Sequence, residues 1–198
     1  MGMPALQRRW TADDVSALID DECAWPRYEL LDGELLVTPA PEPSHQFIVG
    51  EVFAMLHAYL EREPIGIAFT SPADIRLHPE SLLQPDVFIV PAGTRIAGKR
   101  LRWPDVKSLL LAVEILSPCT ARDDRVRKRD FYLNSGVGEY WIVDSDARLI
   151  ERWTPLAERP ELIRDHFRWS PPGAKPLDVD VAARFERLIK TGALPRLL

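Results

Sequence analysis

Apolar residues recur along the chain in short runs that predict a mixture of strands and helices. Four runs have the length and spacing of strands that share one sheet: 65–70, 85–90, 109–116 and 139–144. Apolar residues at helical spacing predict helices at 44–62 and 120–135, packed on that sheet. The order of helix, three strands, helix and strand indicates an α/β (α+β) fold, with a mixed sheet flanked by helices.

Turn and capping residues define smaller elements around this core. Asp32-Gly33 between two apolar runs predicts an N-terminal hairpin over 28–37. Thr11 with Asp14, and Thr120 with Asp123, have the spacing of a capping box at the start of a helix. The remaining elements are three strand-like runs and a last helix, at 74–77, 148–153, 166–169 and 181–190.

No internal repeat or linker divides the chain, and 198 residues are enough to build one hydrophobic core. We therefore expect one domain over 1–198, with its core at about 25–153 and a C-terminal strand and helix appendage over 154–198. The polar, turn-rich segment 92–107 is expected to be a surface loop.

Composition excludes several classes of protein. The hydrophobic content of 46% and charged content of 28% are ordinary for a soluble globular protein. No apolar run approaches the ~20 residues that cross a bilayer, and the first residues lack the apolar core of a signal peptide. Cys23 and Cys119 are too few for a disulfide framework or a structural zinc site. Together these features predict a cytoplasmic protein.

Two carboxylates inside apolar runs are the strongest chemical signal. Asp86 follows Pro85 at the start of one predicted strand, and Glu114 lies within another. A carboxylate in a buried strand is costly unless it is paired or bound to a cation. With Lys128 on the helix that follows, the two carboxylates predict a site for a hard divalent metal and a polarised water. Such a site is suited to phosphodiester hydrolysis.

Several segments, in order along residues 25–153, carry a family resemblance: Arg27–Leu35, His45, Gln84–Asp86, Val113–Pro118, Asp124–Arg125 with Lys128, and Gly136–Asp144. They resemble the Uma-two family of bacterial restriction-endonuclease-like proteins, within the PD-(D/E)XK nuclease superfamily. The resemblance implies a restriction-endonuclease-like core with Asp86 and Glu114 as metal ligands. In the wider superfamily a lysine stands two residues after the glutamate, where this chain has Leu116. The family pattern places a lysine on the next helix, which Lys128 matches.

The leading hypothesis is therefore a metal-dependent endonuclease acting on DNA. Asp86, Glu114 and the backbone carbonyl of Ile115 would hold Mg²⁺, for which Mn²⁺ could substitute, and Lys128 would orient or deprotonate the attacking water. Lys128→Met is expected to lower cleavage about 10²-fold with little effect on folding. Two alternatives stay open: a catalytically inactive nuclease fold used for DNA binding or assembly, and a phosphoesterase acting on a small substrate, which a closed pocket would favour.

The remaining expectations concern the surroundings of the site. Glu34 and His45 match family positions and are candidates to line the site, although the hairpin and the helix start could equally explain them. The net charge of −5 means that DNA binding would depend on local basic patches. The candidates for phosphate contacts are Arg122, Arg125, Arg127 and Arg129, together with Arg95, Lys99, Arg100 and Arg102.

The charge-dense helix segment is also typical of a solvated helix face. Double-strand cleavage needs two active sites, so a homodimer is expected. The hairpin at 28–37 and the C-terminal segment 194–198 are its candidate surfaces.

Overall fold

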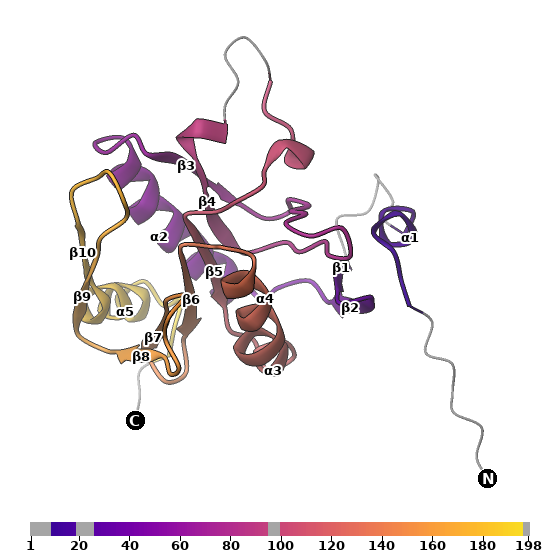
Figure 1. The fold of residues 1–198 in the computed structure, drawn as a ribbon. Coiled ribbons are helices and arrows are strands. Elements are labelled where there is room, and N and C mark those ends of the chain that lie inside the picture. Colours follow the sequence, from indigo (N-terminus) through magenta and orange to yellow (C-terminus); the bar gives the residue numbers. More distant parts are fainter. Residues whose placement is uncertain (1–8, 19–25, 95–99, 196–198) are drawn as a thin grey trace.

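The computed structural model describes residues 9–18, 26–94 and 100–195 (Figure 1). Its centre is a six-stranded sheet with the strand order β3-β4-β5-β6-β7-β8. Neighbouring strands are antiparallel except for β5 and β6, which are parallel. The four strand runs expected in one sheet all lie in it, which confirms the mixed sheet. The strands are β3 (Gly66–Thr70), β4 (Val87–Pro91), β5 (Leu111–Ile115), β6 (Glu139–Asp144), β7 (Leu149–Trp153) and β8 (Glu161–Ile163).

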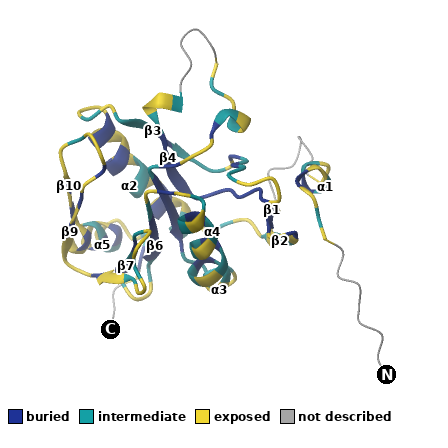
Figure 2. Cartoon of the chain, viewed as in Figure 1, coloured by how far each residue is buried: buried dark blue, intermediate teal, exposed yellow. Residues whose placement is uncertain are grey.

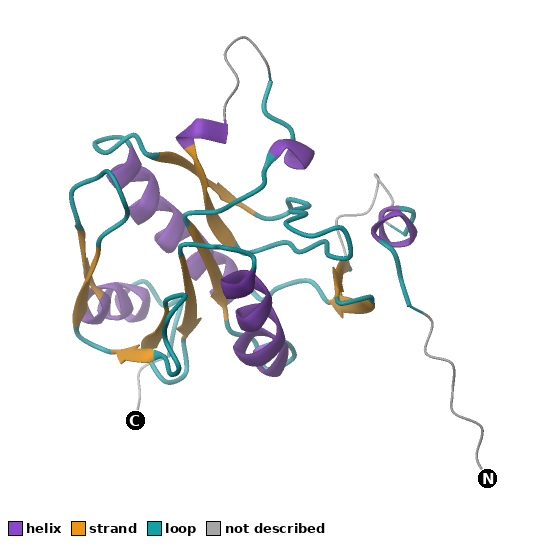
Figure 3. Ribbon diagram, in the orientation of Figure 1, coloured by secondary structure: helices purple, strands orange, loops and turns teal. Residues whose placement is uncertain are grey.

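Helices cover both faces of the sheet (Figures 1 and 3). Helices α2 (Pro43–Leu60) and α5 (Val181–Lys190) pack on one face. The other face carries one continuous helical segment made of α3 (Ala121–Asp123), a π-helical turn (Asp124–Lys128) and α4 (Arg129–Asn134). The two expected helices are therefore confirmed, with a π-helical turn inside the second.

Alternation along β5 separates the two apolar layers. Leu111, Val113 and Ile115 join the core cluster that includes α2 and α5. Ala112 joins the cluster that includes Tyr132 of α4. Successive strand residues point to opposite faces, so Glu114 is directed to the α3–α4 side. Figure 2 shows that the strands between the helices are mostly buried.

The N-terminal hairpin forms a small sheet of its own, from β1 (Arg27–Leu31) and β2 (Glu34–Thr38). Its turn has positive φ at both central residues, 52° at Asp32 and 80° at Gly33. That backbone matches the twist of paired strands and is tolerated best by Asp and Gly. Reciprocal backbone hydrogen bonds of 2.7 and 2.8 Å between Leu30 and Leu82 attach the hairpin to the rest of the molecule.

The terminal elements also agree with the sequence pattern. Helix α1 (Ala12–Ser16) begins with the expected capping box of Thr11 and Asp14. Strands β9 (His166–Trp169) and β10 (Leu177–Asp180) form a second two-stranded sheet before α5. In the part of the chain that the structure describes, no helix is long and apolar enough to cross a membrane.

Some local expectations are wrong. Segment 74–77 is not a strand, because only Ile75 forms a bridge, to Leu83. The capping box expected at Thr120 and Asp123 does not form, since the Thr120 hydroxyl lies 2.9 Å from that of Ser117 instead. Strands β8 and β10 were not expected, because runs of three and four residues are too short to show a periodic pattern.

The described residues between β4 and β5 are largely loop, as expected. It contains short 3₁₀ turns at Ala92–Thr94 and Trp103–Asp105. Arg95 and Lys99 lie outside the described residues.

Candidate active site

Asp86 and Glu114 are brought together by the pairing of β4 with β5. Val87 pairs with Val113 in antiparallel register, so Asp86, the residue before β4, lies across from Glu114 of β5. The backbone N–H of Ile115 donates a 3.0 Å hydrogen bond to Asp86 Oδ2. Only 5% of Asp86 and 3% of Glu114 are exposed, and both line a cavity of about 460 Å³.

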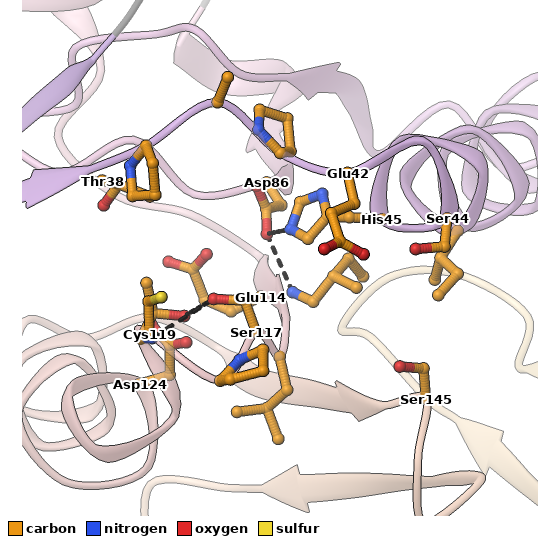
Figure 4. Close-up of a pocket in the computed structure, with 18 of the residues that line it drawn as sticks. Thr38, Glu42, Ser44, His45, Asp86, Glu114, Ser117, Cys119, Asp124 and Ser145 are labelled. Atoms are coloured by element: carbon orange, nitrogen blue, oxygen red, sulfur yellow. Dashed lines mark hydrogen bonds and ion pairs between the residues drawn. The ribbon is translucent and has the colours of Figure 1, made fainter.

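Asp86 is held by cationic and hydrogen-bonding neighbours from two other elements. His45 Nε2, from the start of α2, lies 3.1 Å from Asp86 Oδ2, and the two side chains face each other in Figure 4. Arg27 Nη1, from β1, lies 3.3 Å from Asp86 Oδ1. Burial raises the pKa of Asp86, but the hydrogen bond and charge of His45, the Ile115 N–H and Arg27 outweigh burial and leave that pKa lowered. Asp86 is therefore ionised at neutral pH.

Lys128 is enclosed by three carboxylates. Its Nζ lies 3.0 Å from Glu29 Oε2, 3.2 Å from Glu114 Oε1 and 3.4 Å from Asp124 Oδ1. Burial lowers the pKa of Lys128, but these carboxylates outweigh burial and raise it well above its ordinary value. Lys128 is therefore a fixed ammonium group. It ends the π-helical turn that Asp124 begins, a kind of irregular turn frequent at functional sites.

Glu114 has the opposite electrostatic balance from Asp86. Burial raises its pKa well above the ordinary value, Lys128 opposes this, and the charges of Asp86, Asp124 and Glu29 add to it. The hydroxyl of Tyr132 donates to Glu114 Oε1 at 3.3 Å. Three carboxylates crowd around one ammonium, and the raised pKa of Glu114 means that its ionised form is disfavoured there unless a further cation binds.

The donor set fits a small divalent cation. Among the described residues, no group of three or more His, Cys, Asp or Glu side chains could hold a metal ion by itself. Mg²⁺ does not need such a group, because it keeps several waters and commonly binds through one or two carboxylates. Asp86 and Glu114 supply two carboxylates at the cavity, which Ile115 also lines.

The cavity is bordered by four chain segments: 38–42, 116–120, 145–146 and 193–195. Arg27 and Lys128 are the lysine and arginine side chains among its described lining residues, and both are already ion-paired. The acidic lining residues are more numerous: Glu29, Glu42, Asp86, Glu114, Asp124 and Asp146. The cavity therefore attracts cations more than phosphates.

The two other candidate lining residues lie in different places. His45 lines the cavity. The Glu34 side chain is 58% exposed, is not among the lining residues, and forms a 2.9 Å ion pair with Arg127 Nη2.

Most of the candidate phosphate contacts are engaged within the protein. Arg125 lies 2.6 Å from both Asp144 and Glu151. Arg129 pairs with Asp130 at 2.6 Å and stacks over Trp153 at 4.7 Å. The loop residue Arg102 pairs with Asp105 at 3.3 Å. Arg122 and Arg100 are exposed, and neither pairs with another described residue.

Sequence reasoning missed Arg27, Glu29, Asp124 and Tyr132 as site residues. One signal was present in β1, where Arg27 and Glu29 lie on the same face of the strand as Leu31. Charged residues on the same face as a buried leucine are expected to have oppositely charged partners inside the protein. Asp124 lies one helical turn before Lys128, a spacing that indicates an ion pair. No comparable signal marked Tyr132.

Comparisons with known proteins agree with this architecture. The sequence model of a family described as "Uma2: Putative restriction endonuclease" matches residues 13–179. The structure is similar to the crystal structure of "a putative nuclease belonging to DUF820" from Anabaena variabilis, with a TM-score of 0.73 and 19% sequence identity. The match covers 90% of this chain and 98% of the Anabaena chain, and at that identity it shows a shared fold. No curated protein matches the chain.

Proposed function

This chain belongs to the Uma2 family, and from that premise we propose that it is a metal-dependent endonuclease that hydrolyses phosphodiester bonds in DNA. The observation that carries the proposal is that the buried side chains of Asp86, Glu114 and Lys128 meet at one cavity. Burial and neighbouring charges shift the pKa values of Glu114 and Lys128, and such shifts are common at functional sites.

In this proposal Asp86, Glu114 and the carbonyl of Ile115 hold Mg²⁺, or Mn²⁺ in its place. The bound cation supplies Lewis-acid stabilisation of the charge that develops on the phosphate. His45 and Arg27 keep the Asp86 carboxylate oriented and ionised. Tyr132 holds the Glu114 oxygen that also faces Lys128.

Lys128 has a narrower role than the sequence allowed. Its raised pKa keeps it protonated at neutral pH, so it has no free electron pair with which to remove a proton from water. We assign it to orienting the attacking water and stabilising negative charge through its N–H donors. Of the helix arginines, Arg122 is the one we assign to phosphate contact, because it is exposed and does not pair with another described residue.

A second candidate function is hydrolysis of a small phosphodiester. It is favoured by the cavity, which at about 460 Å³ has the size of a small-molecule site. A short chromogenic phosphodiester added to the same assays distinguishes the two, since a nuclease should prefer DNA.

The direct test is plasmid nicking by purified protein in Mg²⁺ or Mn²⁺, with Glu114→Ala as the control. We expect nicking that depends on the metal and falls by about 10²-fold or more in the control. Absence of nicking by the wild-type protein with both metals would favour the inactive binding or assembly module. Equal nicking by wild type and control would indicate a contaminating nuclease.

A further inference from the structure

Glu29 contacts the proposed machinery directly but belongs to an element outside the central sheet. It is 3% exposed, and its Oε2 lies 3.0 Å from Lys128 Nζ, the shortest of the three carboxylate contacts to that ammonium. Its other oxygen, Oε1, accepts a 2.7 Å hydrogen bond from the backbone N–H of Gln84. Both oxygens of Glu29 therefore have partners.

The chemistry of these contacts requires a carboxylate at this position. Glu29 forms an ion pair with an ammonium through one oxygen and accepts a hydrogen bond from an amide N–H on the other. A glutamine of the same shape has one acceptor oxygen, and its NH₂ group would face one of these two donors. Glutamine therefore cannot keep both contacts, and buried donors left without acceptors are costly.

The hairpin delivers two charges of opposite sign to the site. Arg27 and Glu29 are two residues apart on β1, so their side chains point to the same face. Arg27 pairs with Asp86, and Glu29 pairs with Lys128. The backbone bonds between Leu30 and Leu82 hold β1 beside the segment that leads to Asp86. The spacing of residues 27 and 29 thus links the orientation of Asp86 to that of Lys128.

We propose that Glu29 is a positioning residue, which fixes the Lys128 ammonium against the backbone of Gln84 while leaving the metal ligands to Asp86 and Glu114. The inference rests on the proposed function, because Lys128 is the group whose position matters for cleavage. Glu29 acts through Lys128 and does not touch the reacting atoms.

The test is the Glu29→Gln variant of the full chain, with cleavage kinetics and Mn²⁺ affinity by calorimetry measured on the same samples. We expect kcat to fall about tenfold, because the buried ammonium loses its nearest carboxylate, while KM and the Mn²⁺ dissociation constant stay within about twofold. A loss of Mn²⁺ affinity equal to the loss in kcat would make Glu29 a metal ligand and overturn the inference. An unchanged kcat would also overturn it.

The matched control is Glu186→Gln. Glu186 forms an ion pair with Lys190 at 3.2 Å, a distance similar to that of the Glu29 pair, on the exposed face of α5. Its substitution is expected to leave kcat unchanged. In a Lys128→Met background, Glu29→Gln should lower kcat by less than about twofold, since the group it positions is gone. An equal loss in both backgrounds would contradict the proposal. Should Lys128→Met fail to fold, the single variants and their metal affinities decide.

A readout without activity separates this inference from the proposed function. The buried Lys128 ammonium should give a slowly exchanging signal in heteronuclear NMR, retained in Glu186→Gln and broadened or lost in Glu29→Gln. An unchanged signal in Glu29→Gln would show that Lys128 is held without Glu29. Wild-type protein that fails to cleave DNA would refute the proposed function, and the NMR comparison would still decide whether Glu29 fixes Lys128.

Discussion

The surroundings of Lys128 change the effect on folding that is expected for Lys128→Met. Its side chain is 5% exposed among three carboxylates, so a hydrophobic replacement leaves buried negative charges without their cation. Removing one partner from a buried ion pair commonly destabilises a protein by about 3–5 kcal/mol. The expectation that Lys128→Met barely affects folding, drawn from its hydrophobic stem alone, does not hold for this geometry.

We therefore predict that Lys128→Met lowers cleavage about 10²-fold and lowers the free energy of unfolding by about 3 kcal/mol. Because the folded pKa of Lys128 is raised, its stabilisation is fully present below the unfolded value of 10.5 and is lost as pH rises through the folded pKa. Urea unfolding at neutral pH checks the stability, with the exposed Lys190→Met as control. A midpoint equal to wild type would show that Lys128 lies in solvent.

Asp124 gives a prediction about pH. Burial raises its pKa above the ordinary 3.8, although Lys128 and a hydrogen bond from Thr120 oppose the shift. The folded protein then holds the proton more tightly than the unfolded chain, so ionisation of Asp124 destabilises the fold as pH rises above 3.8. Asp124→Asn lacks this penalty.

The stability of Asp124→Asn relative to wild type should therefore increase with pH, over the range from the unfolded to the folded pKa of Asp124. Urea unfolding of both proteins at a series of pH values between about 4 and 8 measures the difference. A difference that stays constant or decreases across that range would contradict the raised pKa.

At the scale of elements, the β1–β2 hairpin is the least integrated part of the site. It forms its own two-stranded sheet, yet it carries Arg27 and Glu29. Leu30 is fully buried beside Val15 and Leu82 in a small apolar cluster. Leu31 packs in a larger cluster with Tyr132, so two apolar clusters hold β1 in place.

Leu30→Ala should lower the free energy of unfolding by about 2–5 kcal/mol, the usual effect of truncating a buried leucine. Cleavage should fall as well under conditions where the variant is folded, because β1 loses the packing that aims Arg27 and Glu29. Denaturant unfolding and nicking on the same sample test both effects. Leu162→Ala, at a position 56% exposed on β8, is the control and should change stability by less than about 0.5 kcal/mol. A Leu30→Ala protein as active as wild type would mean that the hairpin does not influence the site.

At the scale of the whole molecule, the homodimer stays a prediction. Of the two candidate surfaces, the C-terminal segment is partly used within the chain, since Leu194 is 8% exposed and packs in the main core cluster. The hairpin keeps an exposed apolar residue, because Val37 is 56% exposed. The hairpin is therefore the better candidate for a two-fold contact.

Light scattering at micromolar concentrations should give the mass of two chains, and Val37→Asp should shift it toward one chain. A mass of one chain for the wild-type protein at all concentrations would refute the dimer. Double-strand cleavage would then require two separate encounters with DNA.

The sequence by itself determined the main elements and the two carboxylates. Apolar periodicity and turn residues depend on near neighbours, so the core strands, both long helices and the Asp32-Gly33 hairpin could be predicted. Asp86 and Glu114 could be found for the same reason, because each interrupts an apolar run. The short strands β8 and β10 and the π-helical turn could not, since too few residues carry their pattern.

Only the tertiary structure decided which charges meet. Arg27 reaches Asp86 from 59 residues away, and Glu29 reaches the backbone of Gln84 from 55 residues away. It also decided that most of the helix arginines pair with nearby acids, where the sequence left both phosphate contacts and a solvated helix face open. Local patterns record which residues are apolar or charged, whereas the partner of a buried charge depends on which distant strands and helices the packed core places against it.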